Sequence, residues 1–290
     1  MITLENDFLK VSVRSKGAEL TSIFNKLNST EHLWQADSEV WGWHAPNLFP
    51  VVGGCLNNEI ELDGIKYPME RHGFARHSEF DLIEATNVHA KFSLSYTEAT
   101  LAVFPFKFAF QILYDLFDSK LRVSYKVINH DDKTIWFSIG AHPAFNVPFY
   151  KTENYEDYYI EFEQEEKLEK YLLSTEGYFS RKTEAVATDE NKLPLTHDLF
   201  AKDALVFKNL SSEKVYLKNK KNPDFISLSY PHFNYLGLWA KPDTDFICIE
   251  PWLGCADTEG EMTDFKNKEA IHKVEHGHVY EVDFTIGINI

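Results

Sequence analysis

The chain has 290 residues and a net charge of −16, because 45 acidic side chains outnumber 29 basic ones. This charge argues against nucleic acid and anionic membranes as partners, since both are themselves negatively charged. The 23 Phe, 14 Tyr and 6 Trp exclude a disordered chain, whereas the length alone leaves one or two domains open.

The first ten residues, MITLENDFLK, carry acidic and polar side chains where a signal peptide would have its apolar run, and no apolar stretch matches a membrane span. We therefore expect a soluble cytoplasmic protein. The sequons at Asn28 and Asn209 then carry no meaning, because glycosylation requires a secretory route.

Alternation of apolar and polar residues with a period of two dominates the chain and predicts strands. Residues 59–67 predict a hairpin, because the dipeptide Asp63-Gly64 favours a type I′ turn. The clearest alternation occurs in residues 120–128 and 280–288. Further strands are expected around residues 8–13, 18–24, 80–84, 91–96, 107–117, 134–141, 157–163, 214–218, 225–230, 235–240 and 246–250.

Helical periodicity is weak throughout the chain. The best candidate helices, residues 165–173 and 264–272, are short and charged. Many antiparallel strands joined by short turns predict a mainly β fold, a large antiparallel β-sandwich with few short helices. No linker, repeat or low-complexity tract divides the sequence, so we expect residues 1–290 to form a single domain.

Motifs for cofactors are absent: the sequence has no GxGxxG, P-loop, HExxH or GxSxG. This absence favours proton chemistry or plain binding, without a cofactor or metal. Cys55, Cys248 and Cys255 form no Cys-x-x-Cys pair and are expected to be buried, inert thiols. The densest histidine cluster, from His272 to His278, flanks an expected turn, where a solvated loop is favoured over a metal site.

Three titratable residues lie beside turn residues at the ends of apolar strands, where sites usually form in β folds. His142 ends the run that begins at Ile135, Glu250 ends the run that begins at Phe246, and His72 is followed by a glycine. A carboxylate among apolar and aromatic residues is partly desolvated, which raises its pKa toward that of a useful general base. The two histidines are candidates for the acid.

A structural interpretation of each residue remains open. A histidine at a strand end is more often hydrogen-bonded to a carbonyl than catalytic, and Glu250 could simply pair with Arg71 or Arg76. Together, however, a glutamate base and a histidine acid form a complete proton-transfer pair. Rings such as Trp239 or Phe145 could stack on a sugar, although most aromatic side chains are expected in the core.

At these residues the sequence resembles the aldose 1-epimerase (galactose mutarotase-like) superfamily, most closely its LacX-like branch. The combination of HGFAR, GAHPAFN and EPW carries the most specific part of the resemblance. It implies a large β-sandwich, the galactose mutarotase-like supersandwich, with a sugar-binding cleft. The matching segments are LFPVVGG at 48–54, ERHGFAR at 70–76, FPFKF at 104–108, GAHPAFN at 140–146, DALVF at 203–207 and IEPWLG at 249–254.

The resemblance also implies roles for individual residues. His142 is similar to the general acid that protonates the pyranose ring oxygen, and Glu250 to the general base that removes the proton of the anomeric hydroxyl. Ring opening, rotation about C1–C2 and reclosure then give the opposite anomer without metal or nucleotide. His72 is similar to a second histidine that hydrogen-bonds the substrate, Asp203 to a residue that holds sugar hydroxyls, and Arg76 is a further candidate contact.

The sequence departs from the resemblance at Gly54, where relatives commonly have an arginine. A related branch acts on hexose 6-phosphates, which require positive charge near the phosphate. With only five arginines in the chain, a phosphorylated substrate is less favoured, although Arg71, Arg76 or a lysine could bind one.

The resemblance therefore implies a mutarotase for a free hexose such as galactose or glucose, acting as a monomer or homodimer. The alternatives are a hexose 6-phosphate mutarotase and a non-catalytic sugar-binding module. A glycoside hydrolase would require a second carboxylate beside Glu250.

Overall fold

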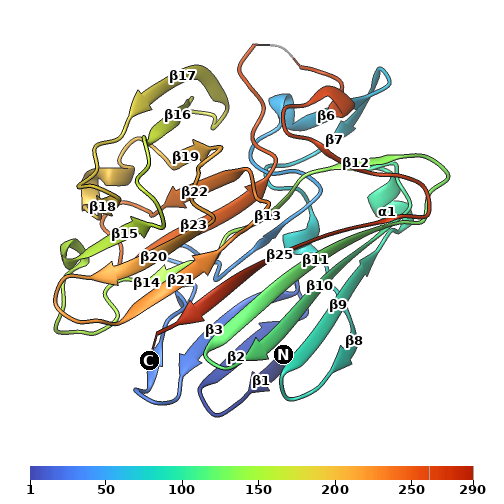
Figure 1. Ribbon diagram of the computed structural model, residues 1–290. Coiled ribbons are helices and arrows are strands. Elements are labelled where there is room, and N and C mark those ends of the chain that lie inside the picture. The colour runs from blue at the N-terminus through green and yellow to red at the C-terminus, as the bar shows by residue number, and fades with distance from the viewer. Residues whose placement is uncertain (261, 290) are drawn as a thin grey trace.

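The computed structural model describes residues 1–260 and 262–289. Antiparallel sheets make up most of it, and short helices are few (Figure 1). This confirms the predicted fold class. One sheet has nine strands in the order β18 (Lys192–Pro194), β15 (Tyr158–Phe162), β20 (Lys214–Asn219), β21 (Phe225–Ser229), β25 (Val279–Ile288), β11 (Lys120–Asn129), β10 (Phe108–Phe117), β9 (His89–Ser95) and β8 (Asp81–Ala85).

A second sheet has eight strands and carries the residues of interest for function. Seven of them follow the order β17 (Phe179–Ala185), β16 (Glu169–Leu173), β19 (Leu205–Lys208), β22 (Tyr235–Trp239), β23 (Phe246–Leu253), β13 (Ile139–Ala141) and β5 (Asn47–Leu48). The eighth strand, β14 (Ala144–Asn146), also pairs with β23.

Smaller sheets complete the fold. The N-terminal sheet contains β1 (Ile2–Glu5), β2 (Leu9–Arg14), β3 (Glu19–Asn25) and β4 (Thr30–Glu31), and two-stranded pairs join β12 (Ile135–Phe137) to β24 (His272–Val274) and β6 (Glu59–Leu62) to β7 (Ile65–Pro68). The last pair confirms the predicted hairpin. Asp63 and Gly64 have φ angles of 52° and 78°, as a type I′ turn requires.

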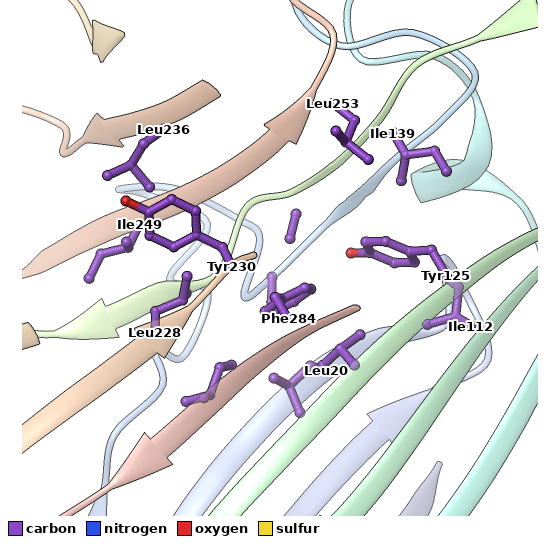
Figure 2. Close-up of a cluster of buried hydrophobic side chains, with 14 of the residues drawn as sticks. Leu20, Ile112, Tyr125, Ile139, Leu228, Tyr230, Leu236, Ile249, Leu253 and Phe284 are labelled. Carbon is purple, nitrogen blue, oxygen red and sulfur yellow. The ribbon is translucent and has the colours of Figure 1, made fainter. Parts of the chain in front are cut away.

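The core lies between the two large sheets. In Figure 2, Leu228 and Phe284 of the nine-stranded sheet lie in one cluster with Leu236 and Ile249 of the eight-stranded sheet. Alternation along each strand explains why, since every second side chain points to the same face. Along β23, Ile249 and its odd-numbered neighbours enter this core, and the even-numbered side chains face the other way.

The two helix predictions were wrong. Residues 169–173 form β16, which lies between β17 and β19, and the segment 264–272 contains a short 3₁₀ helix at Phe265–Asn267 and the first residue of β24. Pairing with strands distant in sequence overrides a weak local helical pattern. The α-helix of the described residues, α1 (Glu98–Leu101), was not predicted, although Thr97 and Thr100 form a capping box at its start.

Other short helices are 3₁₀ turns in connections. They comprise Leu56–Asn58, Ala75–His77, Tyr155–Asp157 and His197–Phe200. Among the described residues, none of the helices has the length and apolar character that crossing a membrane would require.

Candidate active site

Glu250 and His142 meet because of the register of β23. Both β13 and β14 pair with β23 in the same register, on either side of a gap at His142 and Pro143. That register places His142 directly opposite Glu250, where cross-strand side chains come close. Nε2 of His142 lies 3.0 Å from Oε2 of Glu250, and the two side chains are only 12% and 1% exposed.

Glu250 was predicted to end its strand, but β23 continues to Leu253. What is interrupted at Glu250 is the pairing of β23 with its neighbours β13 and β14, not the strand itself. Pro143 and Pro251 have no N–H to contribute to a ladder, and the pairing with β13 and β14 is interrupted where they lie. One backbone hydrogen bond still crosses the gap, because the N–H of Ile249 donates to the Pro143 carbonyl at 3.2 Å.

Burial sets the charges of this pair. It raises the pKa of Glu250 well above its usual range, and the negative charge of Asp203 adds to this effect. Burial also lowers the pKa of His142 to about 3, because a charged imidazolium is poorly solvated there. The pair therefore favours neutral forms and can exchange a proton over a short distance.

His72 is fixed by a reciprocal contact with Gly53. The backbone N–H of Gly53 donates to Nδ1 of His72 at 3.2 Å, and the backbone N–H of His72 donates to the Gly53 carbonyl at 3.0 Å. Nδ1 is thus an acceptor, which leaves Nε2 as the protonated nitrogen and donor. The His72 ring lies edge-on to the His142 ring, 5.8 Å between centroids, and burial lowers its pKa well below the usual range.

All six residues predicted from the sequence line one cavity of about 260 Å³: His72, His142, Glu250, Asp203, Arg71 and Arg76. The structure therefore brings the predicted set together, while the role of each residue stays a prediction. The proposed pairing of Glu250 with Arg71 or Arg76 is not seen, since the partner of Glu250 is His142.

Aromatic residues form one wall of the cavity. The tryptophan loop, residues 37–46, contributes Trp41 and Trp43. Trp41 stacks on the His142 ring at 5.1 Å, and Trp239 lies edge-on to it at 6.0 Å. Trp239 lines the cavity, whereas Phe145 is fully buried in the core, so of the two rings only Trp239 stays a candidate for stacking on a sugar. The loop has no regular pattern, so Trp41 and Trp43 were not predicted from the sequence.

The two arginines lie on the cavity wall without carboxylate partners. Arg76 donates to the Arg71 carbonyl at 2.8 Å, and Arg71 donates to the carbonyl of Glu176 in the β16–β17 turn. Within residues 1–260 and 262–289 neither guanidinium forms an ion pair with a carboxylate, unlike Arg14 and Arg122. Two guanidiniums thus line the cavity without an ion-pair partner among the described residues.

The ring of Tyr178 occupies the space beside Gly54, the position at which relatives commonly have an arginine. A Cβ on Gly54 would lie 3.0 Å from the ring of Tyr178, whose hydroxyl donates to the Cys55 carbonyl at 3.2 Å. Tyr178 follows Gly177, and a Cβ on Gly177 would overlap the Arg71 guanidinium. The β16–β17 turn therefore closes the space at Gly54 and seats Arg71 nearby.

Asp203 lies in the same cavity as Glu250, with an unusual backbone φ of 126°. Its Oδ1 accepts the N–H of Ala204 at 2.6 Å, which orients the carboxylate. The sequence motifs offered no obvious second carboxylate for Glu250, but the structure places Asp203 near enough for its charge to raise the Glu250 pKa. Release of reducing sugar from an aryl glycoside would test that hydrolase alternative.

The cysteines are buried, as predicted. Burial raises the pKa of Cys55 to about 12 and that of Cys255 to about 11, so neither thiol readily forms a thiolate. In the part of the chain that the structure describes, one group of metal-type donors gathers, with ligand atoms of His142, Cys248 and Glu250 within 4.8 Å of one another. Among residues 1–260 and 262–289, the histidines at 272–278 belong to no such group.

Comparisons with known proteins agree with this architecture. A family model described as aldose 1-epimerase matches residues 1–273. The LacX proteins of Lactococcus lactis, plasmid and chromosomal, are each 32% identical over 282 residues and 94% of both chains. Two solved structures superpose with a TM-score of 0.94. They are a galactose mutarotase related enzyme from Lactobacillus acidophilus (33% identity, covering 100% of this chain and 97% of that one) and a galactose mutarotase-like protein from Lactobacillus casei (32%, 100% of both).

Proposed function

The chain belongs to the aldose 1-epimerase family, and we propose that it is a cofactor-independent mutarotase that interconverts the α and β anomers of an aldohexose such as galactose or glucose. The observation that carries the proposal is the contact of Glu250 with His142 on the cavity wall. A base and an acid at this separation can act on two oxygens of one sugar ring.

The reaction requires two proton transfers. The reactive state is the charge-separated one, in which the proton of Glu250 has moved to Nε2 of His142. The Glu250 carboxylate then accepts the proton of the anomeric hydroxyl, the His142 imidazolium donates its Nε2 proton to the ring oxygen, and the C1–ring-oxygen bond breaks to give the open aldehyde. Rotation about C1–C2 presents the other carbonyl face, and reversed transfers close the ring. His72 donates a hydrogen bond from its Nε2–H to the sugar near the ring oxygen, and the Asp203 carboxylate accepts hydrogen bonds from sugar hydroxyls. The proton count of the site is the same before and after turnover.

Anomer exchange of galactose and glucose, followed by polarimetry or NMR, tests this mechanism. Glu250→Gln and His142→Asn should each lower the catalysed rate by about 10²–10⁴-fold, the usual contribution of a general acid or base. Glu161→Gln, which changes a carboxylate of β15 that pairs with Lys218 and does not line the cavity, is the matched control and should keep most of the activity.

Two results would contradict the proposal. One is a wild-type protein no faster than buffer on a panel of hexoses and hexose phosphates. The other is tight sugar binding with no effect of Glu250→Gln on exchange, which would instead favour a non-catalytic sugar-binding module.

A second candidate substrate is a hexose 6-phosphate. The observation in its favour is the pair Arg71 and Arg76, which line the cavity without an ion-pair partner among the described residues. A phosphate would accept charge-assisted hydrogen bonds from them. The expectation that the Gly54 departure disfavours phosphate rested on a lost cation, and Arg71 supplies one beside that position.

Comparing kcat/KM for glucose and glucose 6-phosphate distinguishes the two substrates. If phosphate is bound, Arg71→Gln should lower kcat/KM for the phosphorylated sugar by roughly 10- to 100-fold, as expected for a hydrogen bond to a charged group, and leave glucose nearly unchanged. Arg122→Gln, which removes a surface arginine paired with Asp115, serves as the control. Equal losses on both sugars would argue against a phosphate subsite.

A further inference from the structure

We propose that Glu19 is a positioning residue that holds the tryptophan loop against His142 and so shapes the aromatic wall of the cavity. Glu19 lies on β3 in the N-terminal sheet and lines none of the site itself. Its kinetic consequences rest on the proposed mutarotase function, whereas its structural role does not.

The Glu19 carboxylate binds the loop through two backbone amides. Oε1 accepts the N–H of His44 at 2.8 Å and the N–H of Ala45 at 3.0 Å, while the other oxygen forms an ion pair with Arg14. Glu19 is 1% exposed, and burying a carboxylate costs free energy unless its oxygens are paired. The Glu19 carboxylate is therefore buried at the point where it accepts the N–H groups of His44 and Ala45, at the end of the tryptophan loop.

The same stretch of loop connects to the proposed acid. The His44 carbonyl accepts the N–H of Ala144 at 2.9 Å, two residues after His142, and Trp41 stacks on the His142 ring. The Trp41 carbonyl accepts Nε1–H of Trp34 at 2.9 Å. Displacement of residues 44–45 would therefore disturb the hydrogen bond between His44 and Ala144 and the stacking of Trp41 on the His142 ring.

The ion-pair partner of Glu19 also contacts the wall. The Arg14 guanidinium lies 5.9 Å from the Trp43 ring centroid, and the Arg76 guanidinium lies 5.5 Å from the same centroid. Cation–π attraction from two guanidiniums favours one ring orientation. Glu19 thus holds Trp43 indirectly through Arg14, while it holds the loop backbone directly.

Two variants separate these contacts. Glu19→Gln keeps an oxygen that can accept both amides but loses the ion pair with Arg14, whereas Glu19→Ala loses both. Asp131→Ala is the matched control, because Asp131 is another buried carboxylate that accepts two backbone amides, from Lys107 and Asp132, and it does not line the cavity. All three should lose stability, which thermal unfolding measures.

The decisive measurements are amide hydrogen exchange of residues 40–46, tryptophan fluorescence, and kcat and KM for anomer exchange. Glu19→Ala should speed exchange at His44 and Ala45 by at least about 10-fold, shift the tryptophan emission, and lower kcat/KM by at least about 10-fold. Glu19→Gln should recover most of the amide protection. Asp131→Ala should leave exchange in the loop and kcat/KM at wild-type values.

The proposal is overturned if Glu19→Ala and Asp131→Ala lose similar stability and both keep wild-type loop exchange and kcat/KM. If Glu19→Ala fails to fold, Glu19→Asp decides, because the shorter side chain withdraws the carboxylate from the His44 and Ala45 amides. Faster loop exchange with a reduced kcat/KM supports the proposal, and wild-type values of both refute it. If the wild type has no mutarotase activity, hydrogen exchange and fluorescence still decide whether Glu19 positions the loop.

Discussion

Burial has different consequences for individual titratable residues, according to the partner each one finds. Glu250 and His142 are both desolvated, and their 3.0 Å contact gives a proton two sites to occupy. His32 is only 3% exposed, and neither of its ring nitrogens has a hydrogen-bond partner among the described residues. The first arrangement suits proton transfer, and the second makes folding itself sensitive to pH.

We predict that His32 makes the protein less stable as the pH falls. Burial lowers its pKa from 6.5 to about 4, so between these values the unfolded chain binds a proton that the folded chain does not. Above pH 6.5 the free energy of unfolding does not depend on the protonation of His32. As the pH falls toward 4, that free energy decreases by roughly 3 kcal/mol in total. His32→Leu should reduce the pH dependence of urea-unfolding stability across this window by about that amount, and parallel wild-type and variant curves would contradict the prediction.

At the scale of elements, the sequence predicted strands best where one face is buried. The strands around residues 107–117, 120–128 and 280–288 formed close to their predicted bounds because each alternates between core and solvent. Segment 165–173 was misread because β16 depends on neighbours at β17 and β19, which local periodicity does not contain. Partner strands, more than propensity, decided its conformation.

The candidate site was predictable to a similar extent. Three lining residues, His72, His142 and Glu250, were identified because each is a titratable group beside a turn, whereas Asp203, Arg71 and Arg76 were predicted through the family resemblance. The interrupted ladder that places His142 opposite Glu250 was not predictable, since it depends on register between segments about a hundred residues apart. Trp41 and Tyr178 were missed for a related reason: each lies in a loop or turn that tertiary contacts position.

At the scale of the whole molecule, one cluster of buried apolar side chains connects the sheets. It contains Leu20 of the N-terminal sheet, Phe284 of the nine-stranded sheet, Leu253 of the eight-stranded sheet and Ile60 of the β6–β7 hairpin. A continuous core of this kind ties the stability of each sheet to that of the others. The single-domain organisation expected for residues 1–290 stays a prediction that unfolding experiments can test.

We predict that the chain unfolds in one cooperative transition in scanning calorimetry, with equal van't Hoff and calorimetric enthalpies. Leu20→Ala and Leu253→Ala lie in different sheets, and both residues are at most 2% exposed. Each should cost about 2–5 kcal/mol and lower the midpoint of the same transition by several degrees. A midpoint that rises with protein concentration would indicate the homodimer rather than the monomer. Two transitions, of which Leu20→Ala shifts only one, would instead show that the N-terminal sheet is a separate folding unit.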